Sequence, residues 1–394
     1  MSTSKANFII ASSASSLLRV LSFSLAATMS LPRSSPLLQA LRARSAQPQT
    51  APSLPSLSPL SATSSARSPR QHRAYAIPSF APGSATPSAF SIFDRDLKRA
   101  QRDRAAFDPE RSRLTDYVKD ETAGVMVDRL LDITRRYPLI LDYGSGPGFL
   151  AKHLDEEITQ KVVMVDSSRG MLYRDEGLET EIPVERVHLD EEALSSKFEE
   201  NSQDCIMSCL SMHWINDLPG ALVQIKRTLR PDGVFIGSMF GGDTLFELRT
   251  ALQLAELERE GGISPRISPM TDSQSLTSLL NRAGFSLSTV DLDEVQIAYP
   301  SIYELIDDLK WMGEGNAVVN RRKRLDWETL AAAGEIYKEL HGLEDGSIPA
   351  TFQIMHMIGW KPDPSQPKPA KRGSGTTNLA DVIGDEGFKP LGDK

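Results

Sequence analysis

An acidic residue followed by three alternating glycines is the most chemically informative pattern in this 394-residue sequence. Asp142, Gly144, Gly146 and Gly148 give the pattern D-x-G-x-G-x-G directly after an apolar run, and a second apolar run ends at Asp166. Glycines let a backbone approach a bound ligand with no Cβ in between. A strand, a glycine turn, a helix and a second strand ending in an acid indicate a nucleotide site, in which the second acid accepts hydrogen bonds from ribose hydroxyls.

The spacing of the glycines indicates which nucleotide is bound. Dinucleotide sites favour G-x-G-x-x-G, whose third glycine opens a helix beneath a pyrophosphate. Here the glycines alternate, and Asp142 at the strand end would repel a phosphate but suit an ammonium group. The pattern resembles the S-adenosylmethionine (SAM) site of class I methyltransferases, in which the first acid lies near the amino-acid end of SAM and the second binds its ribose. A glycine-rich loop without a ligand is the alternative.

Further cofactor contacts are expected at the carboxyl ends of the strands, where open α/β sheets bind their ligands. We predict that Asp190 accepts a hydrogen bond from the adenine amino group, although an acid at this position is also a common helix N-cap. Ser167 and Met171 are expected to flank the ribose and the adenine. The remaining candidates for cofactor binding are Ser145, Leu189 and Ser208.

The candidates for catalysis are three residues that follow the fourth and fifth predicted strands. His213 can act as a base, because its unperturbed pKa lies near physiological pH. Trp214 can wall the sulfonium pocket, since cations bind well against an aromatic face. Asp243 follows a glycine pair at a strand end and is expected to help capture the substrate. The structural alternatives are core packing by Trp214 and helix capping by Asp243.

The pair His188 and Asp190 also fits part of the two-histidine, one-carboxylate triad that binds iron. No partner histidine is evident elsewhere in the sequence, and the pair lies at the predicted adenine site. We therefore predict no metal site.

The elements that must position these residues alternate between strands and helices. Strands are predicted at 139–143, 161–165, 184–188, 204–210 and 234–239, then antiparallel strands at 286–292 and 295–299 and a further strand at 351–360. Helices are predicted at 94–118, 122–135, 148–157, 170–174, 191–198, 218–229, 245–260, 273–283, 301–313 and 326–340. This alternation predicts an α/β fold with a Rossmann-like sheet covered on both faces and helical cap insertions at about 241–340.

The first 93 residues contain eight basic residues and no acidic residue, so the remainder carries a net charge of −16 within the total of −8. A basic, serine-rich leader without acids is typical of mitochondrial presequences. We predict a presequence at 1–75 cleaved after Tyr75, a linker and leading helix at 76–114, a main domain at 115–360 and a disordered tail at 361–394. The alternative is a secretory signal with its apolar stretch at 17–31, which Arg19 and several serines interrupt.

The composition argues against several other classes of protein. No apolar run reaches the roughly 18 residues needed to span a bilayer. The acidic body argues against a general nucleic-acid binder, which needs a basic face. Cys205 and Cys209 would lie roughly 13 Å apart along a strand. That separation is too long for a disulfide, and two free thiols fit a reduced compartment such as the mitochondrial matrix.

Five later segments resemble the mitochondrial complex I assembly factor 5 family, over roughly residues 90–375. They read SMHWINDLPGAL, RPDGVFIGSMFGGDTLFEL, EREGGISPRISP, DLKWMGEGNA and PATFQIMHMIGWK. The resemblance implies a SAM-binding protein of the matrix, peripheral to the inner membrane, that assists early assembly of respiratory complex I with other assembly factors. It also implies hydroxylation of an arginine in a core hydrophilic-arm subunit of that complex.

Two other functions remain open from the sequence. The segment from Gly241 to Leu248 also resembles the malonyl-carrier O-methyltransferases of biotin synthesis, which act on a carboxylate. Such an enzyme needs a cation in its substrate site to hold a free carboxylate. The third possibility is a non-catalytic assembly chaperone that uses the SAM pocket as a ligand-gated binding surface.

Overall fold

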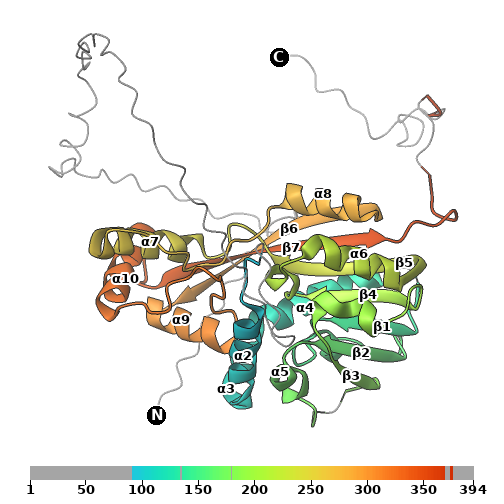
Figure 1. Cartoon of the computed structure of the whole chain (residues 1–394), viewed down its shortest axis with the longest axis horizontal. Helices are drawn as coiled ribbons and strands as arrows, with labels where there is room; N and C mark the ends of the chain where they lie inside the picture. Colours follow the sequence, from blue (N-terminus) through green and yellow to red (C-terminus); the bar gives the residue numbers. More distant parts are fainter. Residues whose placement is uncertain (1–90, 134, 179, 369–372, 376–394) are drawn as a thin grey trace, which may run out of the picture. The chain divides into compact units, whose positions relative to one another are not determined.

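The computed structural model describes residues 91–133, 135–178, 180–368 and 373–375. The predicted presequence at 1–75 lies outside the described residues, as do residues 76–90 of the linker and most of the predicted tail. Element labels follow Figure 1.

A mixed seven-stranded sheet runs through the described part of the chain in the order β3-β2-β1-β4-β5-β7-β6. The strands are β1 (Leu139–Tyr143), β2 (Lys161–Asp166), β3 (Val184–His188), β4 (Gln203–Cys209), β5 (Leu229–Phe240), β6 (Ser286–Tyr299) and β7 (Ile348–Trp360). Strands β1 to β5 are parallel, and β7 pairs antiparallel with β5 and β6. Such a doubly wound sheet has its ligand crevice where the strand order reverses, here between β1 and β4. The predicted α/β class is confirmed.

Helices cover both faces of this sheet (Figure 1). They are α2 (Arg95–Ala106), α3 (Pro109–Arg113), α4 (Tyr117–Leu131), α5 (Arg169–Arg174), α6 (Leu218–Thr228), α7 (Phe246–Glu260), α8 (Ser273–Ala283), α9 (Ile302–Trp311) and α10 (Trp327–His341), with 3₁₀ turns η1 (Leu150–Lys152), η2 (Glu191–Ser196) and η3 (Met212–Trp214). Successive strand residues point to opposite faces. Ile140 therefore packs in the core shared with α4, α7 and α10, whereas Leu141 packs in the core beneath α6 and α8.

The predicted cap range, 241–340, contains elements of two kinds. Helices α7, α9 and α10 pack on one another beside β7 and β6 (Figure 1). Helix α8 packs on α6 and β6, and β6 is a strand of the central sheet. Of the predicted cap range, α7, α9 and α10 therefore form the added helices, and they share one hydrophobic core with α4 and the sheet.

The helix predicted at 148–157 is wrong, because only the short turn η1 forms there. Gly148 has a φ of 101°, which starts the segment outside the helical region. Asp155 then accepts hydrogen bonds from the backbone N–H groups of Glu157 and Ile158, at 2.9 and 3.0 Å. An aspartate side chain that bonds its own following backbone favours a turn over a helix.

Two further element predictions differ from the structure. The strands predicted at 286–292 and 295–299 form one continuous strand, β6, which pairs with β7 nearly end to end. The acids in its middle do not break it, because Asp293 faces Arg129 on α4 at 3.2 Å. The helix predicted at 94–118 is divided into α2, α3 and the start of α4, because Asp108 caps a new helix that begins with Pro109.

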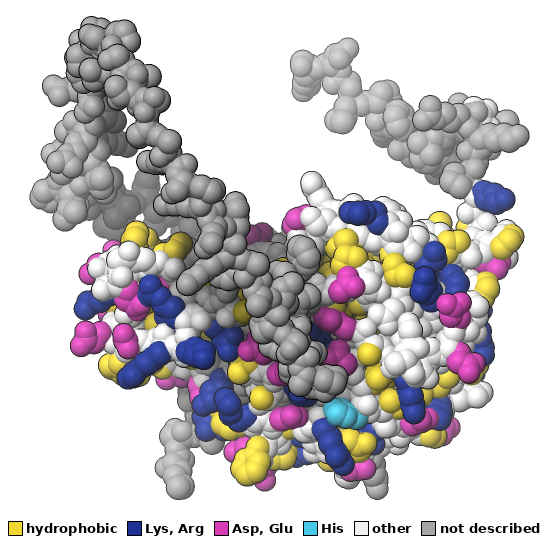
Figure 2. Space-filling model, in the orientation of Figure 1, with side chains coloured by type: hydrophobic (Ala, Val, Ile, Leu, Met, Phe, Trp, Pro, Cys, Tyr) yellow, Lys and Arg dark blue, Asp and Glu magenta, His cyan; other side chains and the backbone are white. Residues whose placement is uncertain are grey.

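On the face drawn in Figure 2, acidic and basic side chains are interspersed over the described residues. Within that described part, no helix combines the length and the apolar character needed to cross a membrane.

Candidate functional site

The glycine turn after β1 adopts a backbone that favours glycine. Gly144, Gly146 and Gly148 have φ values of 72°, 56° and 101°, a region in which a Cβ is strained. The N–H groups of Gly144 and Ser145 donate to the carbonyl of Val165 in β2, at 2.8 and 3.0 Å. The turn is therefore fixed against the neighbouring strand end.

Asp142, at the end of β1, is a buried carboxylate without a hydrogen-bond partner on either oxygen. Burial, and then the charge of Asp166, raise the pKa of this carboxyl well above its usual value. An unpartnered buried carboxylate is costly, so Asp142 suits a ligand that brings a cation. The ammonium of SAM is such a cation, and the residues present fit this cofactor.

Asp166, at the end of β2, is held in one orientation by the backbone. Its oxygens accept hydrogen bonds from the N–H groups of Gly146 and Ser168, at 2.9 and 2.7 Å. Burial raises the pKa of Asp166, although the nearby Arg102 acts in the opposite direction. The structure thus brings both predicted acids to the glycine turn.

Asp190 and Glu191 differ in their positions. Asp190 caps η2 by accepting from the N–H of Glu192 at 2.9 Å, pairs with Arg95 at 2.7 Å, and has a side chain that is 45% exposed. The side chain of Glu191 is buried and accepts a hydrogen bond from the Ser167 hydroxyl at 3.1 Å. Asp190 therefore has the N-capping role that was the alternative to adenine binding. Glu191 is the acid nearer the glycine turn. Nothing in the sequence distinguishes Glu191 from its acidic neighbours.

The other predicted cofactor residues lie around the same strand ends. Met171 packs against α2, and Leu189 is partly buried with its N–H bonded to the Asp166 carbonyl at 3.1 Å. Ser208 is buried within β4, and its hydroxyl has no hydrogen-bond partner.

Helix α2 covers this edge of the sheet and supplies two arginines that sequence analysis missed. Arg102 is buried, with Nη1 3.8 Å from Asp166 and 3.6 Å from Glu191, and with Nη2 donating to Ser211 at 3.5 Å. Arg95 forms an ion pair with Glu191. The one available signal was their spacing of seven residues, which places both on one face of a helix.

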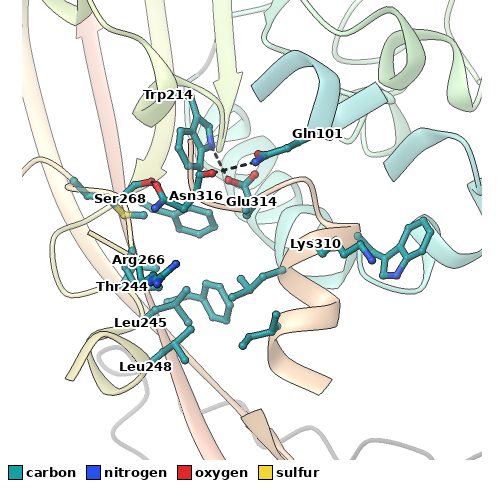
Figure 3. Close-up of a pocket in the computed structure, with 18 of the residues that line it drawn as sticks. Gln101, Trp214, Thr244, Leu245, Leu248, Arg266, Ser268, Lys310, Glu314 and Asn316 are labelled. Atoms are coloured by element: carbon teal, nitrogen blue, oxygen red, sulfur yellow. Dashed lines mark hydrogen bonds between the residues drawn. The ribbon is translucent and has the colours of Figure 1, made fainter. Parts of the chain in front are cut away.

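A cavity of about 300 Å³ is lined by residues that include parts of α2, α7, α9 and the loop that follows α9. Most of its walls are apolar, and Trp214, Phe240 and Phe352 contribute aromatic rings. Figure 3 shows that Gln101 and Glu314 point toward the same end of the cavity as the indole of Trp214.

Glu314 is the charged group at that end. It lies 2.7 Å from Nζ of Lys119, accepts the indole N–H of Trp214 at 2.7 Å, and is 3.1 Å from Nε2 of His213. Burial alone would raise the pKa of Glu314, but Lys119 and His213 hold it well below its usual value. The lowered pKa favours the ionised form of Glu314 in this cavity. Glu314 lies about a hundred residues from His213 and Trp214, and its signal in the sequence was its place in the family segment DLKWMGEGNA.

The predicted catalytic residues take three different positions. Trp214 lines the cavity, whereas His213 does not and packs behind it against the rings of Trp214 and Phe240. Burial lowers the pKa of His213, although Glu314 opposes this shift. Because a carboxylate only accepts hydrogen bonds, His213 donates Nε2–H to Glu314 and positions it. Asp243 is exposed, accepts a hydrogen bond from Gln353 at 3.1 Å, and does not line the cavity.

Across the described ranges, no group of three or more His, Cys, Asp or Glu side chains is arranged to hold a metal ion. Nε2 of His188 lies 3.0 Å from the carbonyl of Ser167. Cys205 and Cys209 are buried and free, as expected from their spacing.

The sequence is similar to those of several known proteins. A family model described as a methyltransferase domain matches residues 117–290. The chain is 52% identical over 294 residues to the mitochondrial arginine-hydroxylase NDUFAF5 of Mus musculus, and the match covers 75% of this chain and 84% of that protein. The human protein of the same name is 50% identical over 304 residues, with coverage of 77% and 87%. The chain belongs to the NDUFAF5 arginine-hydroxylase family.

Membership of the NDUFAF5 family confirms the resemblance found in the later segments, and the methyltransferase domain confirms the predicted fold class. The chain is also similar to the malonyl-[acyl-carrier protein] O-methyltransferase of Gallionella capsiferriformans, at 30% identity over 256 residues that cover 61% of this chain and 82% of that protein. This second similarity is weaker, although it spans the same fold.

Proposed function

We propose that this protein binds SAM at the glycine turn and, with a two-electron oxidant supplied by a separate co-reactant, hydroxylates an arginine side chain held in the adjoining cavity, as a mitochondrial assembly factor for respiratory complex I. The target is a core subunit of the hydrophilic arm, and the protein works with other assembly factors in the matrix, peripheral to the inner membrane. Family membership supports the reaction class. The buried Glu314 carboxylate, in a cavity whose walls are mostly apolar, is the observation that carries the assignment of the arginine site.

The cofactor side of the site provides what SAM requires. Asp142 supplies an acceptor for the ammonium, Asp166 supplies one for the ribose hydroxyls, and the glycine turn allows a close backbone approach. The proposed contact set remains Asp142, Gly144, Ser145, Gly146, Gly148, Asp166, Ser167, Met171, Leu189, Asp190 and Ser208.

The substrate side suits an arginine in three respects. A guanidinium offers five N–H donors, and the cavity presents the Glu314 carboxylate and the oxygen of Gln101, which is buried without a partner. The ring of Trp214 lies at the same end, where a planar cation can stack. Apolar residues such as Leu248 and Leu309 line the remainder, where the methylenes of an arginine can pack.

Mass spectrometry of the complex I core subunits tests the proposal. Cells with the wild-type protein are compared with cells that lack it, and with cells that carry Glu314→Gln or the exposed control Arg99→Gln. We expect one arginine to lose the mass of an oxygen atom without the protein and with Glu314→Gln, but not with Arg99→Gln. Unchanged arginine masses in all samples would contradict hydroxylation. Normal complex I assembly by Glu314→Gln, without the modification, would favour a non-catalytic chaperone.

Arg266 gives the O-methyltransferase alternative a specific observation. Its Nε donates to Glu256 at 2.6 Å and its Nη1 donates to the Arg324 carbonyl at 3.0 Å, while its buried Nη2 has no partner and the residue lines the cavity. A fixed, free N–H can hold a carboxylate, which is what an O-methyltransferase requires of its substrate site. A carrier-bound acyl carboxyl that gains the mass of a methylene group, with no change on any arginine, would support this function.

A further inference from the structure

Two basic side chains mark the place where the cavity opens to solvent. Of the described residues that line it, only Arg104 on α2 and Lys310 on α9 are exposed, while the others are buried or half-buried. Figure 3 shows Lys310 apart from Gln101 and Glu314, which point toward the other end of the cavity. A side chain that enters from solvent therefore passes two positive charges before it reaches the carboxylate of Glu314.

Neither Arg104 nor Lys310 has an acidic partner in the described ranges of the chain. The acids within four residues of them in the sequence all have other partners: Asp103 bonds the start of α5, Asp108 caps α3, Asp307 pairs with Arg111, Asp308 accepts from Tyr117, and Glu314 pairs with Lys119. Both cations lie in the last turn of their helices, where the helix dipole stabilises positive charge. The helix ends therefore hold two cations at the opening without a counter-charge.

This arrangement sets a condition on the substrate. A guanidinium alone would be repelled at the opening and attracted only inside, by Glu314. A substrate removes this barrier when it carries negative charge beside its arginine. We propose that Arg104 and Lys310 form a recognition site for acidic side chains next to the target arginine, so that the cavity accepts an arginine from an acidic stretch of polypeptide.

The two cations then contribute to both rate and specificity. Complementary charge speeds the encounter with an acidic segment, and like charge at the opening excludes arginines that lie in basic segments. The inference rests on the proposed function, because it takes the cavity as the arginine site.

Calorimetric titration of the purified full chain with three short peptides, in the presence of S-adenosylhomocysteine, tests this site. Each peptide has blocked ends and one central arginine, which is flanked by two aspartates, two alanines or two lysines. At about 0.1 M salt we expect the affinity to fall in that order. At about 1 M salt the screening length shortens from about 10 Å to about 3 Å, so the differences between the peptides should shrink.

Two double variants with equal net charge separate the site from the overall charge of the protein. Arg104→Gln with Lys310→Gln should weaken binding of the aspartate peptide about 3- to 10-fold and leave binding of the alanine peptide nearly unchanged. Arg99→Gln with Lys338→Gln removes the same charge from exposed positions outside the cavity and should bind all three peptides like the wild type. Glu314→Gln should weaken binding of all three, because it acts on the guanidinium that they share.

Three results would overturn the recognition site and leave the arginine site standing. The first is equal affinity of the wild type for the aspartate and alanine peptides. The second is an equal loss in the two double variants, which would assign the effect to net charge. The third is tight binding of a peptide with alanine in place of the arginine between the aspartates, because the cations would then serve another acidic ligand. If the wild type binds none of the peptides, the arginine site itself is wrong and the inference falls with it.

Discussion

The indole of Trp214 donates its N–H to Glu314 across 2.7 Å, while Nζ of Lys98 lies 3.3 Å from the centre of the same ring. Three separate segments meet at this ring: α2, the turn after β4 and the loop after α9. Because α2 also covers the glycine turn, the cofactor cleft and the cavity share one buried polar cluster. We therefore expect changes at one site to be measurable at the other.

Asp142→Asn is expected to stabilise the free protein and to abolish SAM binding. A carboxyl whose pKa is raised by folding stabilises the fold fully below its unfolded pKa, and this contribution is lost as the pH rises through the folded pKa. The pKa of Asp142 is raised by burial, so the wild type loses this stability toward neutral pH and the amide does not. Thermal unfolding should give the variant the higher Tm at neutral pH, with a difference that shrinks toward pH 4.

The ligand response provides the control for that variant. S-adenosylhomocysteine at about 100 times its Kd should stabilise the wild type by about 2.7 kcal/mol, and the Tm of Asp142→Asn should not move. A variant that is less stable than the wild type at neutral pH, or that keeps the ligand shift, would contradict the role given to Asp142.

Glu314→Gln should remove arginine hydroxylation and also reduce stability, because it leaves Lys119 buried without its counter-charge. Breaking a buried ion pair on one side costs about 3–5 kcal/mol. Adding Lys119→Met should restore much of the unfolding free energy while activity remains lost, as measured by denaturant titration and product mass spectrometry. Recovery of activity in the double variant would show that Glu314 is structural only.

Gly144→Ala is expected to abolish ligand binding and to destabilise the fold. The new Cβ would overlap the Ser211 hydroxyl, and the φ of 72° would be strained, at a cost of at least about 1–2 kcal/mol. Gly177→Ala is the matched control, because its Cβ would meet no atom within 4 Å. Denaturant unfolding and calorimetry should separate the two, and equal behaviour would contradict the close packing at this turn.

His356 should make the protein sensitive to moderate acid. Burial, assisted by Arg129, lowers its pKa from 6.5 to about 4. A group with a depressed folded pKa loses its stabilising contribution as the pH falls, here between about 6.5 and 4. His356→Gln should remove about 3 kcal/mol of this acid-dependent loss, measured as the pH dependence of the unfolding free energy. A wild-type stability that is flat across this window would contradict the assignment.

The local chemistry of the glycine turn explains why half of the site could be predicted. Asp142, the glycines and Asp166 lie within one strand-turn-strand unit. In such a unit the number of residues between two positions predicts how close they lie in the structure. Asp190 shows the limit of this argument, since its capping bond and Arg95 occupy the side chain that sequence analysis assigned to adenine. The helix predicted at 148–157 does not form for a similarly local reason. The Asp155 side chain bonds the backbone that follows it and favours a turn, which the apolar periodicity did not reveal.

The sequence by itself determined the α/β fold, the glycine turn with its two acids and the family to which the chain belongs. The tertiary structure alone decided that Arg102 reaches the glycine turn, that Glu314 rather than Asp243 meets Trp214, and that His213 supports that carboxylate from behind. The physical reason is the distance along the chain over which each interaction acts. Turn geometry and strand periodicity act between neighbours in the chain, whereas a buried charge takes its partner from whichever segment the packed core brings to it.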